Sequence, residues 1–121
     1  MSAVALVAAA VAFARWRPFR VEVVGGSMRP ALEPGEWAIA VRAGAAAPGV
    51  VVVLEHPERP GFELVKRLID VVPGGALWVE GDAEDASTDS RTFGAVAPGQ
   101  LVGRVVLVYH PWRRARLVGR R

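Results

Sequence analysis

Cysteine is absent from this 121-residue chain, which excludes a disulfide framework, a thiolate metal site and a cysteine nucleophile. Histidine is also scarce, since only His56 and His110 are present, far apart and each followed by proline. With no cysteine and no clustered histidine, the sequence predicts no zinc site. No other metal or cofactor is expected.

Lysine is nearly absent too, because Lys66 is the single lysine among the 15 basic residues and arginine supplies the rest. A bias toward GC-rich codons would explain the abundance of arginine. The exception is informative, since a buried lysine can lose its proton whereas arginine stays charged in a protein. Lys66 is therefore a candidate for proton chemistry.

Long hydrophobic runs are limited to the N-terminus, where residues 3–14 contain only Ala, Val, Leu and Phe. A membrane-spanning helix needs about 20 apolar residues, so this run predicts a short apolar helix within residues 1–19. The helix could anchor weakly in a membrane, dock on protein or belong to a cleaved signal, and membrane association is favoured. The arginines at 15, 17 and 20 favour a cytoplasmic position for the domain after the helix.

The rest of the chain is typical of one mainly β domain. Its composition is 52% hydrophobic, which is ordinary for a globular protein and argues against disorder. Pro-Gly turn signals separate short runs rich in Val, Ile, Leu and Trp, and residues 72–75 read as a hairpin turn. The expected strands are Arg20–Val24, Trp37–Arg42, Val50–Glu55, Phe62–Val72, Leu77–Glu80 and Leu101–His110.

One stretch places a serine on a tight turn. An apolar strand runs into Gly25 and Gly26, Ser27 comes next, and Pro30 lies three residues later. Such a turn exposes the hydroxyl and brings backbone N–H groups close to it, which is how a fold presents a nucleophile. Whether Ser27 is one depends on a base elsewhere in the chain.

Lys66 lies in a strand where that base could be held. Alternation places Lys66 on one strand face with Leu64 and Leu68, and places Glu63 and Arg67 on the other. Burial on an apolar face lowers the pKa of a lysine, so a neutral amine could take a proton from a serine hydroxyl. The alternative is a lysine whose amine extends to the surface.

The longest polar stretch, residues 79–94, is rich in carboxylates and hydroxyls. It lacks the ligand spacing of a calcium-binding loop. Asp89 and Arg91 lie two residues apart, and short polar side chains bond readily to nearby backbone. We expect an ordered loop held by an Asp89–Arg91 pair, with Ser87 or Ser90 directed inward.

Together these pieces resemble the signal peptidase I family of serine proteases, which use a Ser/Lys dyad. The resemblance covers roughly residues 20–110, and it rests on three motifs that occur in the family's order. These motifs are Gly25-Gly26-Ser27-Met28-x-Pro30, Lys66-Arg67 after an apolar strand, and Gly81-Asp82-x4-Ser87-x-Asp89-Ser90-Arg91-x2-Gly94.

The resemblance implies a role for each matched residue. Ser27 would be the nucleophile that forms an acyl-enzyme, and Lys66 the general base and later the acid. Ser87 would hydrogen-bond the lysine, while Asp89 and Arg91 would form an ion pair that supports the site. The implied fold is a compact antiparallel β fold of the signal peptidase and repressor-protease type.

Further implications concern the groove and its oxyanion hole. Met28 would pack near the substrate cleft, and Ser27 N–H would be one oxyanion donor. The second donor would be backbone at Gly25, where some members of the family carry Ser or Thr. The family's Gly-Asp-Asn reads Gly-Asp-Ala here, with Ala83 in the third position. The substrate would be an extended peptide of a precursor protein, with small residues before the cut.

The resemblance also divides the chain into an N-terminal helix (1–19), a peptidase domain (20–112) and a basic C-terminal tail (113–121). The function expected is removal of N-terminal leader or signal peptides. The compact chain is similar to small proteases that mature nickel superoxide dismutase, which would be a narrower role.

Two other functions stay open. One is a self-cleaving repressor-type Ser/Lys protease, although the residues before Ser27 are too few for a DNA-binding domain. The other is a non-catalytic, membrane-associated binding module in which the arginine-rich tail is the working part. That tail reads most simply as solvated. Binding to nucleic acid is not expected, because no aromatic platform or nucleic-acid motif accompanies the tail.

Overall fold

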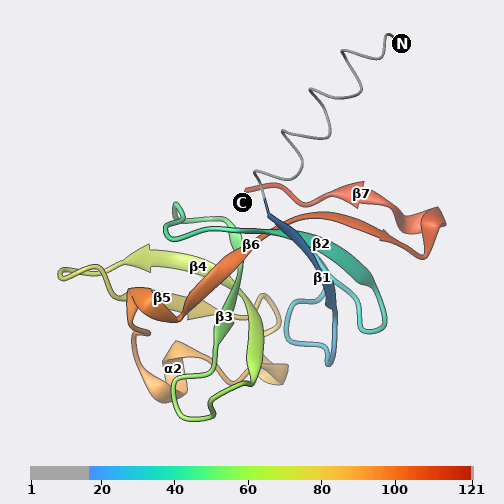
Figure 1. Cartoon of the computed structure of the whole chain (residues 1–121). Helices are drawn as coiled ribbons and strands as arrows, with labels where there is room; N and C mark the ends of the chain where they lie inside the picture. Colours follow the sequence, from blue (N-terminus) through green and yellow to red (C-terminus); the bar gives the residue numbers. More distant parts are fainter. Residues whose placement is uncertain (1–16, 121) are drawn as a thin grey trace, which may run out of the picture.

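The computed structural model describes residues 17–120, which form a seven-stranded antiparallel sheet (Figure 1). The prediction of a mainly β, antiparallel fold is therefore confirmed. The strand order is β1-β2-β6-β3-β4-β5, and β7 pairs with β6 outside this path. The strands are β1 (Pro18–Glu22), β2 (Trp37–Arg42), β3 (Val51–Glu55), β4 (Glu63–Val71), β5 (Leu77–Glu80), β6 (Leu101–His110) and β7 (Arg116–Leu117).

Helical structure is confined to single turns in the described part of the chain. These turns are η1 (Glu84–Ala86), α2 (Ser90–Phe93), η2 (Pro98–Gln100) and η3 (Trp112–Arg114). None of the helices within residues 17–120 has the length and apolar character needed to cross a membrane. The predicted apolar helix and possible anchor at residues 3–14 lie outside the described residues.

The long strand β6 connects the two parts of the sheet. It pairs with β2 from Gly103 to His110, while its other edge pairs with β3 at the start of the strand and with β7 at Leu107 and Val108. Gly103 has no room for a side chain, because a Cβ there would meet the Val41 carbonyl and the Phe19 ring. Because Gly103 has no side chain, β6 can lie close to β1 and β2 at the point where it also pairs with β3.

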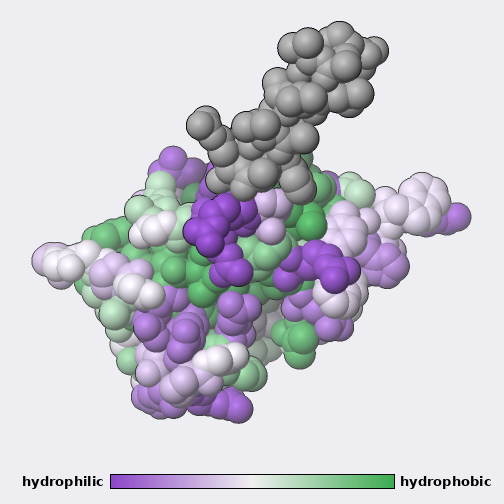
Figure 2. Space-filling model, viewed as in Figure 1, coloured by the Kyte–Doolittle hydropathy of each residue, from purple (hydrophilic) through white to green (hydrophobic). Residues whose placement is uncertain are grey.

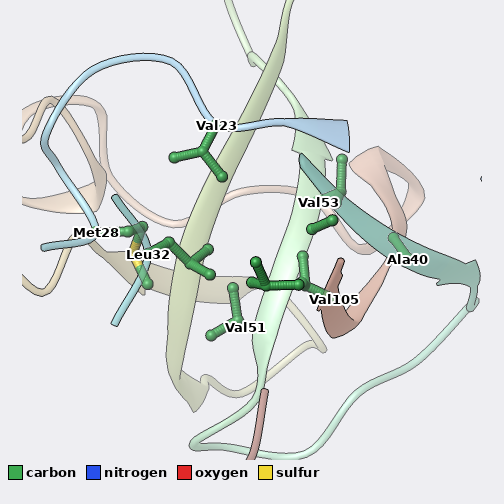
Figure 3. Close-up of a cluster of buried hydrophobic side chains, with 9 residues drawn as sticks. Val23, Met28, Leu32, Ala40, Val51, Val53 and Val105 are labelled. Atoms are coloured by element: carbon green, nitrogen blue, oxygen red, sulfur yellow. The ribbon is translucent and has the colours of Figure 1, made fainter. Parts of the chain in front are cut away.

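Two buried apolar clusters form the core. The consecutive residues of β3 point alternately into them, which explains why Val51, Val52, Val53 and Leu54 are all buried. Figure 3 shows part of the first cluster, in which Met28 and Leu32 lie side by side with Val23 nearby. The first cluster is Val23, Met28, Leu32, Ala38, Ala40, Val51, Val53, Val105 and Val108, and the second is Val52, Leu54, Leu68, Leu77, Val79 and Val96.

The structure matches the expected strands at β2, β5 and β6 and shortens the expected β3 and β4 by one residue or two. The first strand is displaced: it was predicted at 20–24 but runs over Pro18–Glu22, paired with β2. The reason is that Val23 leaves the β1–β2 ladder and its carbonyl accepts a hydrogen bond from Gly35 N–H at 2.8 Å. This bond closes the loop between β1 and β2.

The prediction of a solvated basic tail is wrong for Arg116, which forms the short strand β7 with the exposed Leu117 beside β6 (Figure 1). Arg116 lies opposite Val108, and Val118 N–H donates to Val106 O at 2.9 Å. Arg116 also forms an ion pair with the buried Glu36. The sequence around Arg116 indicates a solvated segment because its buried partner, Glu36, lies 80 residues earlier in the chain.

Candidate active site

Ser27 lies in the loop of residues 23–36, which we call the serine loop. Val23 and Glu36 close the neck of the loop, because Val23 N–H donates to Glu36 O at 2.8 Å. The buried side chains of Met28 and Leu32 fasten the loop to the first core cluster (Figure 3). Gly25 has φ +76°, a conformation that favours glycine. The sequence therefore folds this segment into a turn that leaves Ser27 partly exposed.

Lys66 lies in β4, opposite Val52 of β3, and is only 4% exposed. This agrees with the apolar strand face predicted from alternation. Burial lowers the pKa of the Lys66 amine because the charged form loses hydration; the nearby Asp89 raises this pKa and Arg91 lowers it. The net direction is down from the usual value. A larger share of neutral amine is therefore present near neutral pH than for an exposed lysine.

A chain of hydrogen bonds orients the lysine. Lys66 Nζ donates to Ser87 Oγ at 3.0 Å, and Ser87 Oγ donates to Asp89 Oδ2 at 2.5 Å. Lys66 uses only one N–H for Ser87, so the other hydrogen atoms of the amine, and its lone pair when it is neutral, can be directed to other groups. Of the two serines considered in sequence, Ser87 contacts the lysine, whereas Ser90 Oγ accepts from Val79 N–H at 2.9 Å.

Asp89 is the centre of this network and is fully buried. Burial alone would raise the pKa of the Asp89 carboxyl, but hydrogen bonds from Arg91, Ser87 and Gly81 outweigh burial and hold the pKa far below its usual range. The Arg91 guanidinium donates from Nη2 at 2.6 Å and from Nε at 3.0 Å. Asp89 also caps α2 by accepting from Arg91 N–H at 3.0 Å. The Asp89–Arg91 pair expected from sequence is thus present.

A second ion pair, between Arg67 and Asp82, is missing from the sequence predictions. The two side chains are buried and meet twice, with Arg67 Nη2 at 2.7 Å from Asp82 Oδ2 and Nε at 3.2 Å from Oδ1. The next residue, Ala83, donates its N–H to Ser27 O at 2.9 Å. Through this path, the strand that carries Lys66 is tied to the backbone of Ser27.

Gly81 lies where the three segments converge. A Cβ at this position would be 2.6 Å from Ser27 O and closer still to Ser87 Oγ. Its N–H donates to Asp89 Oδ2 at 2.9 Å. Any side chain here would separate the serine loop from the hydrogen-bond partner of Lys66, so the close approach depends on glycine.

Ser27 and Lys66 line the same open groove, whose volume is about 420 Å³. Its walls come from the end of β1 with the start of the serine loop, and from the start of β4. Val24 and Phe62, both on these walls, are large apolar residues with 81% and 44% of their surface exposed. On the face shown in Figure 2, apolar residues lie between groups of hydrophilic ones.

Within residues 17–120, the hydrogen bonds do not include one between Ser27 Oγ and Lys66 Nζ. The two residues share the groove, and the loop of residues 81–89 contacts both: Ala83 N–H bonds to Ser27 O, and Ser87 Oγ to Lys66 Nζ. Catalytic hydrogen bonds are often long or unformed in empty sites. The structure therefore places an amine whose pKa is lowered by burial and a partly exposed hydroxyl in one groove.

Comparisons with known proteins find similar sequences over most of the chain. A family model described as signal peptidase, peptidase S26, matches residues 1–71 and 69–112. Mitochondrial inner membrane protease subunit 2 of Schizosaccharomyces pombe is 37% identical over 84 residues, which cover 55% of this chain and 47% of that protein. The subunit 2 of Mus musculus is 31% identical over 126 residues, which cover 79% and 71%. The chain thus spans from about half to about seven tenths of the length of these relatives.

Proposed function

The chain belongs to the signal peptidase family, peptidase S26, and we propose from this that it is a serine endopeptidase with a Ser27/Lys66 dyad. The observation that carries the dyad is the environment of Lys66. The amine is buried, its pKa is lowered chiefly by that burial, and it lies in the same groove as Ser27. A lysine in this state is suited to general-base work.

In the proposed reaction, neutral Lys66 Nζ takes the proton of Ser27 Oγ as the oxygen attacks the carbonyl carbon of the scissile peptide bond. The ammonium then gives this proton to the leaving amine, the C–N bond breaks and an acyl-enzyme remains. The same amine then deprotonates a water molecule that attacks the ester carbonyl, and the resulting ammonium returns the proton to Ser27 Oγ as the C–O bond breaks and the acid product is released. Ser87 keeps the amine oriented through the 3.0 Å hydrogen bond, and Asp89 and Arg91 hold Ser87.

The oxyanion of each tetrahedral intermediate would be stabilised by backbone donors. We assign Ser27 N–H as the first donor and backbone at Gly25 as the second, because Gly25 has no side chain that could donate. Preorganised N–H groups in a site shielded from water stabilise such a charge strongly. The path from Arg67 and Asp82 to the Ser27 carbonyl restrains the backbone that carries the first donor.

The substrate proposed is an extended peptide of a precursor protein with small residues before the cut. Backbone on the two groove walls can pair with an extended chain, and the exposed Val24 and Phe62 offer apolar contact. Family membership and the inner membrane proteases among its relatives support association with a membrane. We propose a weak N-terminal anchor and a cytoplasmic-facing domain, on the strength of the arginines at 15, 17 and 20.

The test compares Ser27→Ala, Lys66→Ala and Lys66→Arg in the full chain, with cleavage of a fluorogenic leader peptide as the measurement. Each variant is expected to lose at least about 10³-fold in kcat, because dyad members act as a unit. Lys66→Arg keeps the positive charge but cannot accept a proton. Thr92→Ala, an exposed hydroxyl change in α2, is the matched control and should keep full activity.

The outcomes separate the possible functions. Activity retained by Lys66→Arg, or by Ser27→Ala, would refute the dyad. A wild-type chain that binds vesicles but cleaves no precursor would favour the non-catalytic module, and cleavage of the chain itself alone would favour a repressor-type protease. Circular dichroism of each variant establishes that the sheet is intact.

A narrower proposal concerns the substrate. On the resemblance to small maturation proteases, we propose the leader of a nickel superoxide dismutase precursor. Incubation of the chain with that precursor and, separately, with a secretory preprotein distinguishes the two substrate classes. Cleavage of the preprotein alone would overturn the narrower proposal while leaving the endopeptidase assignment in place.

A further inference from the structure

The carboxylate of Glu36 is completely buried at the end of the serine loop, and two arginines from the far end of the chain, Arg114 and Arg116, form ion pairs with it. Arg116 of β7 contacts both oxygens, with Nη1 at 2.8 Å from Oε2 and Nη2 at 2.8 Å from Oε1. Glu36 Oε1 also accepts from Glu33 N–H at 2.7 Å. The hydrogen bonds from Arg116 lower the pKa of the Glu36 carboxyl, so that the pair stays charged.

The same guanidinium reaches a second point of the serine loop. Arg116 Nη2 donates to Ala31 O at 2.6 Å, while Nη1 donates to Arg114 O at 2.8 Å within the C-terminal segment. Five donors in a planar fork allow one arginine to make all of these contacts at once. The loop is therefore held at Ala31 and at Glu36 by Arg116, while Arg114 Nε lies 3.4 Å from Glu36 Oε2.

Arg116 is itself held by the sheet. It lies opposite Val108 of the long strand β6, and Val118 N–H donates to Val106 O on the other side of Leu117. In Figure 1, β7 runs beside β6. The serine loop, which comes after the edge strand β1, is thus connected through Arg116 to the central strand of the sheet.

The C-terminal segment also contacts strand β4, which carries Lys66, through the neighbouring residue Arg67. Arg67, the neighbour of Lys66, donates from Nη1 to Gly119 O at 3.4 Å and to Gly49 O at 3.0 Å. Arg120 Nε donates to Pro48 O at 2.8 Å. Residues 116–120 therefore touch the loop that carries Ser27 and the arginine next to Lys66.

A buried ion pair adds little net stability but specifies one geometry, because an alternative loop position would leave a buried carboxylate unpaired. From these contacts we infer that Arg116 is a positioning residue for the nucleophile: it holds the serine loop, through Glu36 and Ala31, at the spacing from Lys66 that acyl transfer requires. This inference rests on the proposed function for its catalytic consequence. The structural part, restraint of the serine loop, is independent of it.

The kinetic test uses Arg116→Ala and Arg116→Lys in the full chain, with Arg113→Ala as the matched control. Arg113 belongs to the same basic segment but stacks on Trp112 and is exposed. Because a displacement of about 1 Å can lower a rate about 100-fold, kcat should fall about 10- to 100-fold in both Arg116 variants. KM should change less than about threefold, and Arg113→Ala should match wild type.

The pH profile distinguishes positioning from a change in the base. Ser87, Asp89 and Arg91, which set the surroundings of Lys66, are untouched by these variants, so the limb of kcat against pH should stay in place while its height falls. Unchanged kcat in both Arg116 variants would overturn the inference. So would a loss of activity that tracks the unfolded fraction and disappears when the assay is cooled.

Hydrogen–deuterium exchange tests the restraint without reference to activity. In Arg116→Ala, the amides of Leu32 and Gly35, which bond within the loop to Met28 O and Val23 O, should exchange faster than in wild type. Amides of the β3–β4 ladder should not change. Equal exchange at the loop amides would overturn the inference even if the chain proves to be no protease, so the two failures are distinguishable.

Discussion

The pH dependence of cleavage should move in opposite directions when the two charges nearest the Lys66 network are removed one at a time. Asp89 favours the ammonium form of Lys66 and Arg91 disfavours it. In Asp89→Asn, the pKa of the Lys66 amine should therefore fall, and the rising limb of the activity–pH curve, on which the amine loses its proton, should move to lower pH. In Arg91→Gln, the pKa should rise and the limb should move to higher pH, because activity requires the neutral amine.

The size of the first displacement can be worked from the geometry. Lys66 Nζ lies 3.0 Å from Ser87 Oγ, which lies 2.5 Å from Asp89 Oδ2, so the two charges are at most about 5.5 Å apart. Their Coulomb energy is about 3 kcal/mol at an effective dielectric constant of 20 and about 0.8 kcal/mol in bulk water. At 1.36 kcal/mol per pH unit, the limb should move down by about 0.5 to 2 units. Burial of the amine favours the larger value.

The assay is kcat/KM against pH with a fluorogenic leader peptide, since this ratio reports the pKa values of the free enzyme. The control is Arg113→Gln, which removes the same charge as Arg91→Gln but lies beyond the far end of β6 from Lys66. Movement of both site variants in one direction, or an equal displacement in the control, would refute the assignment of the limb to Lys66. Thermal melts show whether the loop around Asp89 is retained.

Two further predictions concern the support of the groove. Gly81→Ala should lower kcat about 100-fold or more, because its Cβ would lie 2.6 Å from the carbonyl oxygen of Ser27, the proposed nucleophile. The control Gly44→Ala, with open space around the new Cβ, should keep wild-type kcat. Equal kcat in the two variants would show that the close approach at Gly81 is not needed. Asp82→Asn should lower the free energy of unfolding, measured in urea, by about 3 to 5 kcal/mol, because it leaves Arg67 buried without its ion pair. Asp85→Asn, at an exposed position, is the control. A loss below about 1 kcal/mol in Asp82→Asn would contradict this prediction.

Much of the fold was predictable from local pattern. Strands β2, β5 and β6 begin and end where alternation and turn signals place them. Lys66, predicted to lie on an apolar face of its strand, is buried in β4. The pairing of Asp89 with Arg91 was also predictable, since residues two apart on a tight loop can meet whatever the rest of the chain does. The dyad itself stays a prediction, carried by motif order and by the shared groove.

Other features depend on register between distant segments. Alternation assigned Arg67 to the face opposite Lys66 but could not show that this face is buried, and hence that Arg67 needs Asp82. The same holds for Glu36, whose partner lies 80 residues later in a segment that reads as solvated. A charged side chain has many possible partners in sequence, and only folding selects one.

The sequence by itself determined the residue types that the chemistry needs, a glycine-flanked serine and a single lysine on an apolar strand face, because dihedral preference and side-chain alternation act over a few residues. The tertiary structure alone decided how these residues are held together. Sheet pairing brings Gly81, Ser87 and Arg116 against segments far away in the chain. Burial then makes each of those contacts specific, since a charge or hydroxyl removed from water must keep the partner that the fold provides.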